Sequence, residues 1–268
     1  MTAEPSVPTT TDDLRVEQDG PVLVVTLARP AKRNALSDAM VLRLQAIFDA
    51  IPSAQEPVRA VVIAAEGDHF CAGLDLASLG EKDTFEGILH SRMWHRAFEA
   101  IESGPVPVIC ALQGAVVGGG LELAAATHVR VAEPSTFFAL PEGSRGLFVG
   151  GGGSVRVPRL VGTHRMADMM LTGRVYEAAD GVAAGFAQYL VGEGEAKAEA
   201  LRLAHRVAQN APASNFAVVQ ALPRIAEVGP TEGLLMESLM AAIAQGTPDA
   251  KARMAAFLEG RANKVKEA

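Results

Sequence analysis

Three consecutive glycines, Gly118 to Gly120, lead directly into LELAAAT, a segment typical of a helix. The amides in the first turn of a helix have no partner within it and point at whatever lies in front of them. Amides held in place in this way can stabilise an oxygen that becomes negative during a reaction. A tight turn between a strand and a helix would also explain the glycines, because glycine commonly serves where backbones approach closely. The side chains nearby decide between the two interpretations.

Two glutamates near these glycines have the chemistry for proton transfer. Glu122 stands in the first turn among Leu and Ala residues, so we expect its carboxylate to be half-buried. Desolvation favours the protonated form of a carboxyl group, which would suit Glu122 to proton transfer. The alternative is a surface carboxylate that pairs with the helix dipole or caps the helix. Glu142, in ALPEGSRG, follows an apolar run and a proline, and taken alone it is more typical of a loop residue than of a catalyst.

Other motifs that carry chemistry are missing from the sequence. Neither glycine cluster, 118–120 or 150–153, has the GxGxxG pattern or the Gly-Lys-Ser/Thr ending of a nucleotide-binding loop. Ser154 does not lie in the GxSxG pattern of a nucleophilic serine. The histidines lack the spacing of a zinc site on a helix, and we predict no metal site. They are His69, His90, His95, His128, His164 and His205.

Composition favours a soluble globular protein over a disordered or fibrous one. The chain has 268 residues, of which 49% are hydrophobic and 21% are charged. Its 24 Lys and Arg face 31 Asp and Glu, so the net charge of −7 provides no overall field for nucleic acid or an anionic membrane. No apolar run reaches the roughly 18 residues of a membrane span, and the start of the chain lacks the order of a signal peptide. We therefore expect a cytoplasmic protein without nucleic-acid or membrane partners, whose Cys71 and Cys110 are reduced core residues.

Strand-like and helix-like segments alternate along most of the chain. After a tail at 1–12, two strand-like runs flank Asp19-Gly20, a dipeptide that favours a tight hairpin. Ser37 is placed to cap a helix whose apolar residues recur at helical spacing. Apolar runs at 58–65 and 106–112 enclose a helical stretch near 84–103. This alternation predicts parallel sheets covered by helices.

The character of the chain changes beyond about residue 195, where Ala-, Leu- and Met-rich helical segments are separated by prolines. Thr247 is a predicted cap for the last helix, and Pro248 occupies its first position. An apolar helical region after a complete α/β body often serves assembly.

Five segments together resemble the crotonase (enoyl-CoA hydratase/isomerase) family, in that family's order and spacing, from about residue 14 to the end. They are VTLARPAKRNALS, HFCAGLDLASL, GAVVGGGLELAAAT, ALPEGSRGLFVGGGGSVRVPRLVG and LTGRVYEAADGVAAGFAQYLV. The resemblance implies an α/β fold, a spiral of ββα units over residues 13–200. Residues 201–268 would then form a helical oligomerisation region that gives a homotrimer or a dimer of trimers.

The resemblance also implies a role for each candidate residue. The amides of Leu74 and Gly119 would stabilise the enolate oxygen of an acyl-CoA thioester, Glu142 would protonate C2, and Glu122 would orient water toward C3. Coenzyme A, present only as part of the substrate and with no further cofactor, would lie along Phe70, Cys71, Ala72, Leu74, Leu76 and Gly118. Lys32 and Arg33 would lie near its phosphates, although a solvated turn explains them equally well. Gly260 stands at the position of the family's C-terminal lysine, three residues after Phe257, and Arg261 or Lys264 would have to replace that lysine.

These roles predict hydration of 2-trans-enoyl-CoA to 3-hydroxyacyl-CoA. A Δ3,Δ2-enoyl-CoA isomerase or a specialised dehydratase or lyase acting on a CoA thioester is the alternative within the same fold. A further alternative is not an enzyme but an acyl-CoA-binding scaffold without catalytic activity. The presence of both glutamates disfavours this scaffold. Trp94 and Met93 would line an acyl tunnel or, more simply, pack in the core. PEGSRG departs from the hydrophobic run that relatives carry after the glutamate, which bears on the identity of the substrate.

Overall fold

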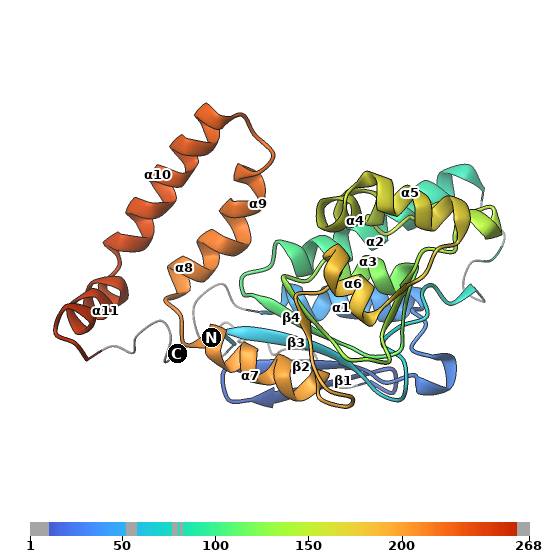
Figure 1. Ribbon diagram of the computed structural model, residues 1–268, viewed down its shortest axis with the longest axis horizontal. Coiled ribbons are helices and arrows are strands. Elements are labelled where there is room, and N and C mark those ends of the chain that lie inside the picture. Colours follow the sequence, from blue (N-terminus) through green and yellow to red (C-terminus); the bar gives the residue numbers. More distant parts are fainter. Residues whose placement is uncertain (1–10, 52–57, 77–79, 81–82, 262–268) are drawn as a thin grey trace, which may run out of the picture. The chain divides into compact units, whose positions relative to one another are not determined.

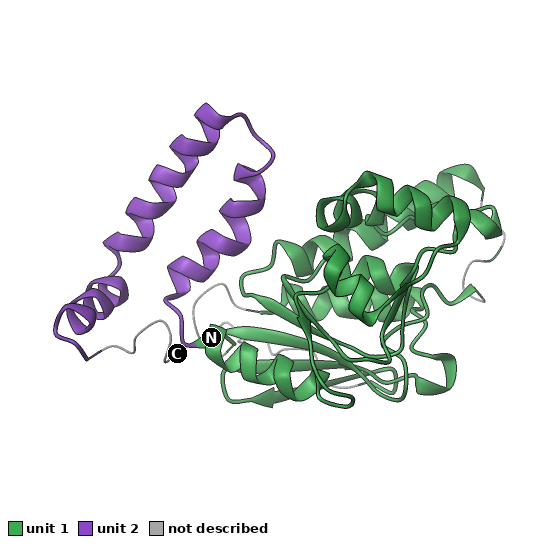
Figure 2. Ribbon diagram, in the orientation of Figure 1, with its two compact units in different colours: residues 1–208 green, residues 209–268 purple. Residues whose placement is uncertain are grey.

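The computed structural model describes residues 11–51, 58–76, 80 and 83–261 (Figure 1). The chain forms two compact units, Met1–Ala208 and Gln209–Ala268 (Figure 2). This division falls eight residues later than the boundary expected at 200/201, because helix α7 (Ala196–Ala208) packs on the strands β3, β4 and β6 of the first unit. Most of the predicted N-terminal tail, residues 1–10, lies outside the described residues.

A six-stranded sheet organises the first unit. Its strand order is β1-β2-β3-β4-β6-β9, and all neighbours except β1 and β2 run parallel. The bounds are β1 Leu14–Asp19, β2 Val22–Leu27, β3 Ala60–Ala65, β4 Val108–Leu112, β6 Val129–Ala132 and β9 Tyr189–Leu190. The predicted hairpin at Asp19-Gly20 is confirmed, since β1 and β2 are antiparallel and Gly20 takes a φ of 56° that suits glycine.

A smaller sheet has the strand order β5-β7-β8. Along the chain, its strands come between strands of the large sheet. It consists of β5 (Ala115–Val117), β7 (Phe137–Ala139) and β8 (Tyr176–Glu177). The chain passes from β4 to β5 to helix α3 (Gly119–Ala125), and then from β6 to β7 and onward to helix α4 (Gly153–Val161). Each pass is one ββα unit, so the predicted spiral of ββα units is confirmed, as are the parallel sheets with helices over them.

Local signals explain where helices α1 and α2 of the first unit begin. Helix α1 (Asp38–Asp49) starts after Ser37, whose side chain accepts a hydrogen bond from the Met40 amide, as predicted. Helix α2 (Thr84–Glu102) starts after Asp83, which forms a capping box with Glu86. The two helices pack against each other. Further helices described in the unit are α5 (Thr163–Thr172) and α6 (Ala178–Ala184), with short 3-10 turns η1 (Pro30–Lys32) and η3 (Gly143–Arg145).

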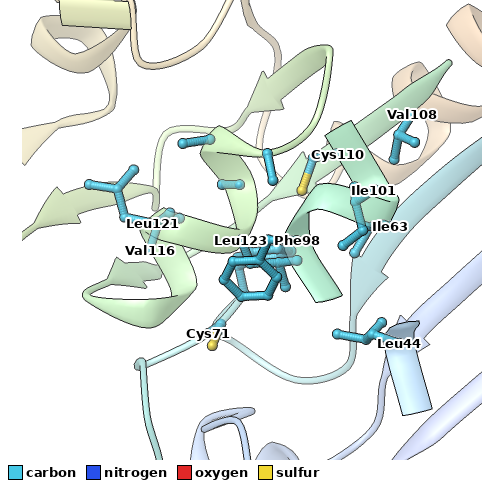
Figure 3. Packing of buried hydrophobic residues seen from close by; sticks show 14 of the residues in the cluster. Leu44, Ile63, Cys71, Phe98, Ile101, Val108, Cys110, Val116, Leu121 and Leu123 are labelled. Carbon is cyan, nitrogen blue, oxygen red and sulfur yellow. The ribbon is translucent and has the colours of Figure 1, made fainter. Parts of the chain in front are cut away.

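Alternate residues of the strands feed two separate cores. Leu23 and Val25 of β2 belong to the core shared with α1, α2 and α3, whereas Val22 and Val24 belong to a second core that contains residues of α7. Burial on both faces explains why the strands read as continuous apolar runs. Cys71 and Cys110 are free and buried, in the larger core (Figure 3). Burial raises the pKa of the Cys71 thiol to about 12 and also raises that of Cys110, which keeps both thiols protonated.

The second unit is helical. It contains α8 (Pro212–Phe216), the π-helical segment η4 (Ala217–Ala221), α9 (Leu222–Ile225), α10 (Pro230–Gly246) and α11 (Pro248–Leu258). The predicted cap of α11 is confirmed, because the Thr247 hydroxyl accepts a hydrogen bond from the Ala250 amide. Several large apolar side chains of the unit are exposed, among them Leu234, Leu239, Ile243 and Phe257. Across the described residues, no helix has both the length and the apolarity needed to cross a membrane.

Candidate active site

One cavity of about 450 Å³ in the first unit gathers most of the predicted site residues. Its wall is built from the loop that follows β3, the first three turns of α2, the junction of β5 with α3, and the segment 141–151. Leu74, Gly119, Glu122 and Glu142 all contribute to that wall. Leu74 and Glu142, which are 68 positions apart in the sequence (142 − 74), therefore face a single cavity.

Parallel pairing of β5 with β7 brings the two halves of the site together. Val117 pairs with Ala139 at the ends of these strands, and the Gly118 amide donates to the Ala139 carbonyl at 3.0 Å. Parallel strands end at the same edge, so the glycine turn after β5 and the Pro141-Glu142 segment after β7 emerge side by side. A Cβ on Gly118 would lie only 2.7 Å from Oε1 of Glu142. Gly118 has a φ of 52°, and only glycine fits this position without strain.

Leu74 reaches the same turn through a loop that is fixed on both sides. The Leu36 amide donates to the Gly73 carbonyl, and the Asp75 amide donates to the Leu36 carbonyl, each at 2.8 Å. A Cβ on Gly73 would lie 2.9 Å from the Val117 carbonyl oxygen, so the two backbones touch. A Cβ on Gly119 would lie 3.3 Å from the Leu74 nitrogen.

The amides of Leu74 and Gly119 are consequently neighbours on the cavity wall. In the part of the chain that the structure describes, neither of them donates a hydrogen bond to a protein acceptor. Gly119 is the first residue of α3, where amides have no partner within the helix. Two such donors, held by rigid backbone, can bind one oxygen and stabilise negative charge on it.

Glu122 lies in the first turn of α3 and is more deeply buried than the sequence predicted, at 4% exposure. Its Oε1 accepts hydrogen bonds from the amides of Gly151 and Gly153, both at 2.8 Å. Burial raises the pKa of this carboxyl to about 7, with a smaller contribution from the charge of Glu142, while the two amides and Arg156 oppose the rise. Near neutral pH both protonation states are populated, which suits a group that takes up and returns a proton.

The second glycine cluster, residues 150–153, forms a cradle around the carboxyl group of Glu122. A Cβ on Gly153 would lie 2.8 Å from Cγ of Glu122, and one on Gly151 would lie 3.1 Å from its Oε2. Gly152 adopts a φ of 100°, which turns the chain so that the amides on either side of it face the carboxylate. Sequence reasoning recognised that 150–153 is not a nucleotide-binding loop but did not assign it this role.

Arg156 binds the backbone of this glycine cluster, and the sequence analysis did not predict that role. The side chain of this α4 residue is buried, and it donates through Nε to Oε2 of Glu102 at 2.7 Å and through Nη1 to the Gly151 carbonyl at 3.2 Å. Glu99 lies 3.6 Å away as a further acidic neighbour. The sequence signal for this role is a cationic side chain between apolar residues of α4. An Arg that is buried in such a place is rare unless it is paired.

Glu142 lies in the turn after β7 with one carboxylate oxygen available to a ligand. Its Oε2 is buried and has no hydrogen-bond partner among the described residues. Burial raises the pKa of Glu142, while its own backbone amide and the charge of Arg145 lower it. A buried polar atom of this kind calls for a partner in the cavity.

The other predicted residues divide into those on the cavity wall and those behind it. Ala72, Leu76 and Gly118 line the cavity together with Trp94, which also packs edge-on against Phe98 in the core. Trp94 thus fits both interpretations that the sequence allowed.

Phe70 and Cys71 are fully buried behind the wall, where their backbones pair with the segment 113–117. Lys32 and Arg33 are exposed, and the Arg33 carbonyl accepts a hydrogen bond from the Ala72 amide, which places the basic pair beside the cavity loop.

The C-terminal positions belong to the second unit. Gly260 follows α11 with a φ of 71°, Arg261 pairs with Glu259, and Lys264 lies outside the described residues. Among the described residues, no group of three or more His, Cys, Asp or Glu side chains is placed to hold a metal ion.

A ββα spiral that presents two free amides and two carboxyls to one cavity defines a family, and comparison with known proteins identifies it. Residues 17–268 match the model of the enoyl-CoA hydratase/isomerase family, and the chain belongs to that family of enzymes. The chain is 30% identical to the enoyl-CoA hydratase EchA19 of Mycobacterium tuberculosis over 93% of its length and 95% of that protein. It is 32% identical to the 2,3-dehydroadipyl-CoA hydratase of Escherichia coli over 93% of its length and 96% of that protein.

Solved structures agree with this assignment. A crystal structure of a Rhodopseudomonas palustris protein is 59% identical in sequence and superimposes with a TM-score of 0.89 over 97% of this chain and 98% of that one. The enoyl-CoA hydratase of Bacillus anthracis, 29% identical, superimposes with a TM-score of 0.87 over 96% of this chain and 100% of that one. The crotonase fold predicted from the sequence is therefore confirmed.

Proposed function

We propose that the protein adds water reversibly to a 2-trans-enoyl-CoA and forms the 3-hydroxyacyl-CoA. The observation that carries this proposal is the meeting of the Leu74 and Gly119 amides with the Glu122 and Glu142 carboxyls around one cavity. The thioester carbonyl makes C3 of a conjugated enoyl group electrophilic. Attack at C3 moves an electron pair onto the thioester oxygen, which is where two fixed amide donors are most effective.

The two carboxyls divide the proton transfers. Ionised Glu122 accepts a proton from water as its oxygen attacks C3, and protonated Glu142 gives a proton to C2 as the enolate collapses. One water has then been added, and a proton passes from Glu122 back to Glu142 before the next turnover. Burial raises the pKa of both carboxyls, to about 7 for Glu122, which supports a role for both in proton transfer.

The cavity wall also suggests how coenzyme A is held as part of the substrate. We propose that the thioester end lies along Ala72, Leu74 and Leu76. The exposed basic pair Lys32 and Arg33, joined to this loop through the Ala72 amide, would meet the phosphates. The apolar side chains exposed on the second unit support the further proposal of a homotrimer or a dimer of trimers.

An isomerase is the main alternative within the family, because moving a double bond needs the same two amides but one acid. Two carboxyls on the cavity wall favour hydration, since one group is then free to hold and activate water. The other alternative is an acyl-CoA-binding scaffold without catalytic activity. A scaffold would not need the raised pKa of Glu122, which is typical of a group that transfers protons.

Absorbance of the conjugated enoyl thioester tests the proposal. Crotonyl-CoA and a longer homologue should lose this absorbance in the presence of the protein, and Glu142→Gln should reduce the rate on the order of 100-fold or more. Glu17→Gln, at an exposed position of β1, is the matched control and should turn over normally. Formation of conjugated absorbance from a 3-enoyl-CoA, with no loss from crotonyl-CoA, would identify an isomerase. Tight CoA binding with neither reaction would identify a scaffold.

A further inference from the structure

One cation on the cavity wall, Arg145, lies near Glu142 but forms no ion pair among the described residues. Arg145 ends the turn η3, three residues after Glu142, and its amide donates to the Glu142 carbonyl at 3.0 Å. Arg145 is exposed and is one of the residues that line the cavity. Within the described residues, its guanidinium forms no ion pair or side-chain hydrogen bond.

The other polar side chains on this part of the wall are already engaged. His90 lies with Nε2 2.6 Å from Oδ1 of Asp38. The Ser91 hydroxyl donates to the Gly150 carbonyl at 2.6 Å, and Asp83 caps helix α2. Among the described residues of the wall, these contacts leave Arg145 as the cationic side chain with unused hydrogen-bond donors. A guanidinium binds carboxylates and phosphates with two parallel hydrogen bonds, which makes it specific for an oxyanion.

The place of Arg145 along the cavity indicates which part of a substrate it would meet. The thioester oxygen belongs at Leu74 and Gly119, and the reacting carbons belong at Glu142. Arg145 lies one short turn beyond Glu142, and it is followed by Leu147 and Phe148, which give this end of the wall apolar surface. Arg145 is the one Lys or Arg among the described residues of the wall, and an acyl chain that runs past Glu142 would meet it beside this apolar surface.

We propose that the substrate is a dicarboxylic acyl-CoA, an enoyl thioester with a second carboxylate at the far end of its acyl chain, and that Arg145 binds this carboxylate. The inference rests on the proposed function, because that function places the thioester at the two amides. A phosphate of coenzyme A offers the same oxyanion chemistry to Arg145, so the test must separate the two sources.

Binding of saturated, unreactive acyl-CoA pairs makes that separation. Calorimetry on the full-length protein would compare succinyl-, glutaryl- and adipoyl-CoA with butyryl-, pentanoyl- and hexanoyl-CoA, their neutral partners of equal chain length. At one or more lengths the diacid should bind about tenfold more tightly than its partner, as expected for a charge-assisted pair. Arg145→Met should remove this preference and Arg145→Lys should keep part of it. Arg206→Met, at an exposed position of α7 outside the cavity, should leave it unchanged.

Two results would overturn the proposal. One is the absence of a diacid preference at every length in the wild-type protein. The other is an equal loss of affinity for both members of each pair in Arg145→Met, which would assign Arg145 to a coenzyme A phosphate. Because these ligands do not react, the outcome is independent of hydration. A diacid preference without turnover of any enoyl-CoA would refute the proposed function and leave the assignment of Arg145 standing.

Discussion

Burial of Glu122 predicts that the folded state loses stability as the pH rises through neutrality. The pKa of this carboxyl rises from 4.5 to about 7 on folding, because burial penalises the charged form. The folded protein therefore binds this proton more tightly than the unfolded chain does. The stabilisation is complete below pH 4.5 and is lost as the pH rises through 7. The rise corresponds to about 3 kcal/mol of the free energy of unfolding.

Urea unfolding of the wild-type protein and Glu122→Gln, from pH 5 to pH 8, measures this effect. The glutamine variant cannot ionise at this position, so the wild-type free energy of unfolding should fall relative to the variant across this range. Most of the roughly 3 kcal/mol should appear in that difference. Glu17→Gln, which removes an exposed carboxylate of β1, controls for the loss of one negative charge. Parallel wild-type and Glu122→Gln profiles, or a wild-type protein that gains stability with pH relative to the variant, would refute the reasoning.

Three further predictions concern the same cradle. The kcat/KM for hydration should have a bell-shaped pH profile with one limb near 7, because turnover needs one ionised and one protonated carboxyl; a profile that is flat through 7 would show that Glu122 takes no part in the proton transfers. Gly153→Ala should lower kcat/KM on the order of 100-fold, since the added Cβ would lie 2.8 Å from Cγ of Glu122 and displace the carboxyl. Gly246→Ala, with open space around its Cβ position, is the matched control for steady-state assays, and equal activity of the two variants would contradict the cradle. Arg156→Met should destabilise the protein by about 2 kcal/mol in urea unfolding, because it leaves the partly buried Glu102 unpaired; an unchanged midpoint would show that the pair contributes nothing.

Local signals in the sequence were sufficient for much of the fold. The Asp19-Gly20 hairpin, the Ser37 and Thr247 caps and the apolar runs at 58–65 and 106–112 all lie where the residues indicated. Each depends on interactions within a few residues, or on a strand buried on both faces. The compact units divide after Ala208 and not at 200/201, because α7 packs on the sheet of the first unit, a contact that its sequence does not distinguish from those of the helices after it.

The site was predicted in part, and the missing part is long-range. The Leu and Ala neighbours of Glu122 were enough to predict a half-buried carboxylate, and the structure buries it further. Glu142 looked like a loop residue, and only the family resemblance assigned it a function, because the parallel pairing of β5 with β7 that brings it to Gly118 is not visible in the sequence. The hydrogen bonds from Gly151 and Gly153 to Glu122 span about 30 residues and use backbone amides, which leave no side-chain pattern to read.

A crystal structure of the protein with a saturated acyl-CoA such as butyryl-CoA would test the central claim most directly. The thioester oxygen should accept hydrogen bonds from the amides of both Leu74 and Gly119, at about 3 Å. The carboxyls of Glu122 and Glu142 should face C2 and C3 of the acyl group. A thioester oxygen bound elsewhere, or an acyl group that lies away from both carboxyls, would contradict the account.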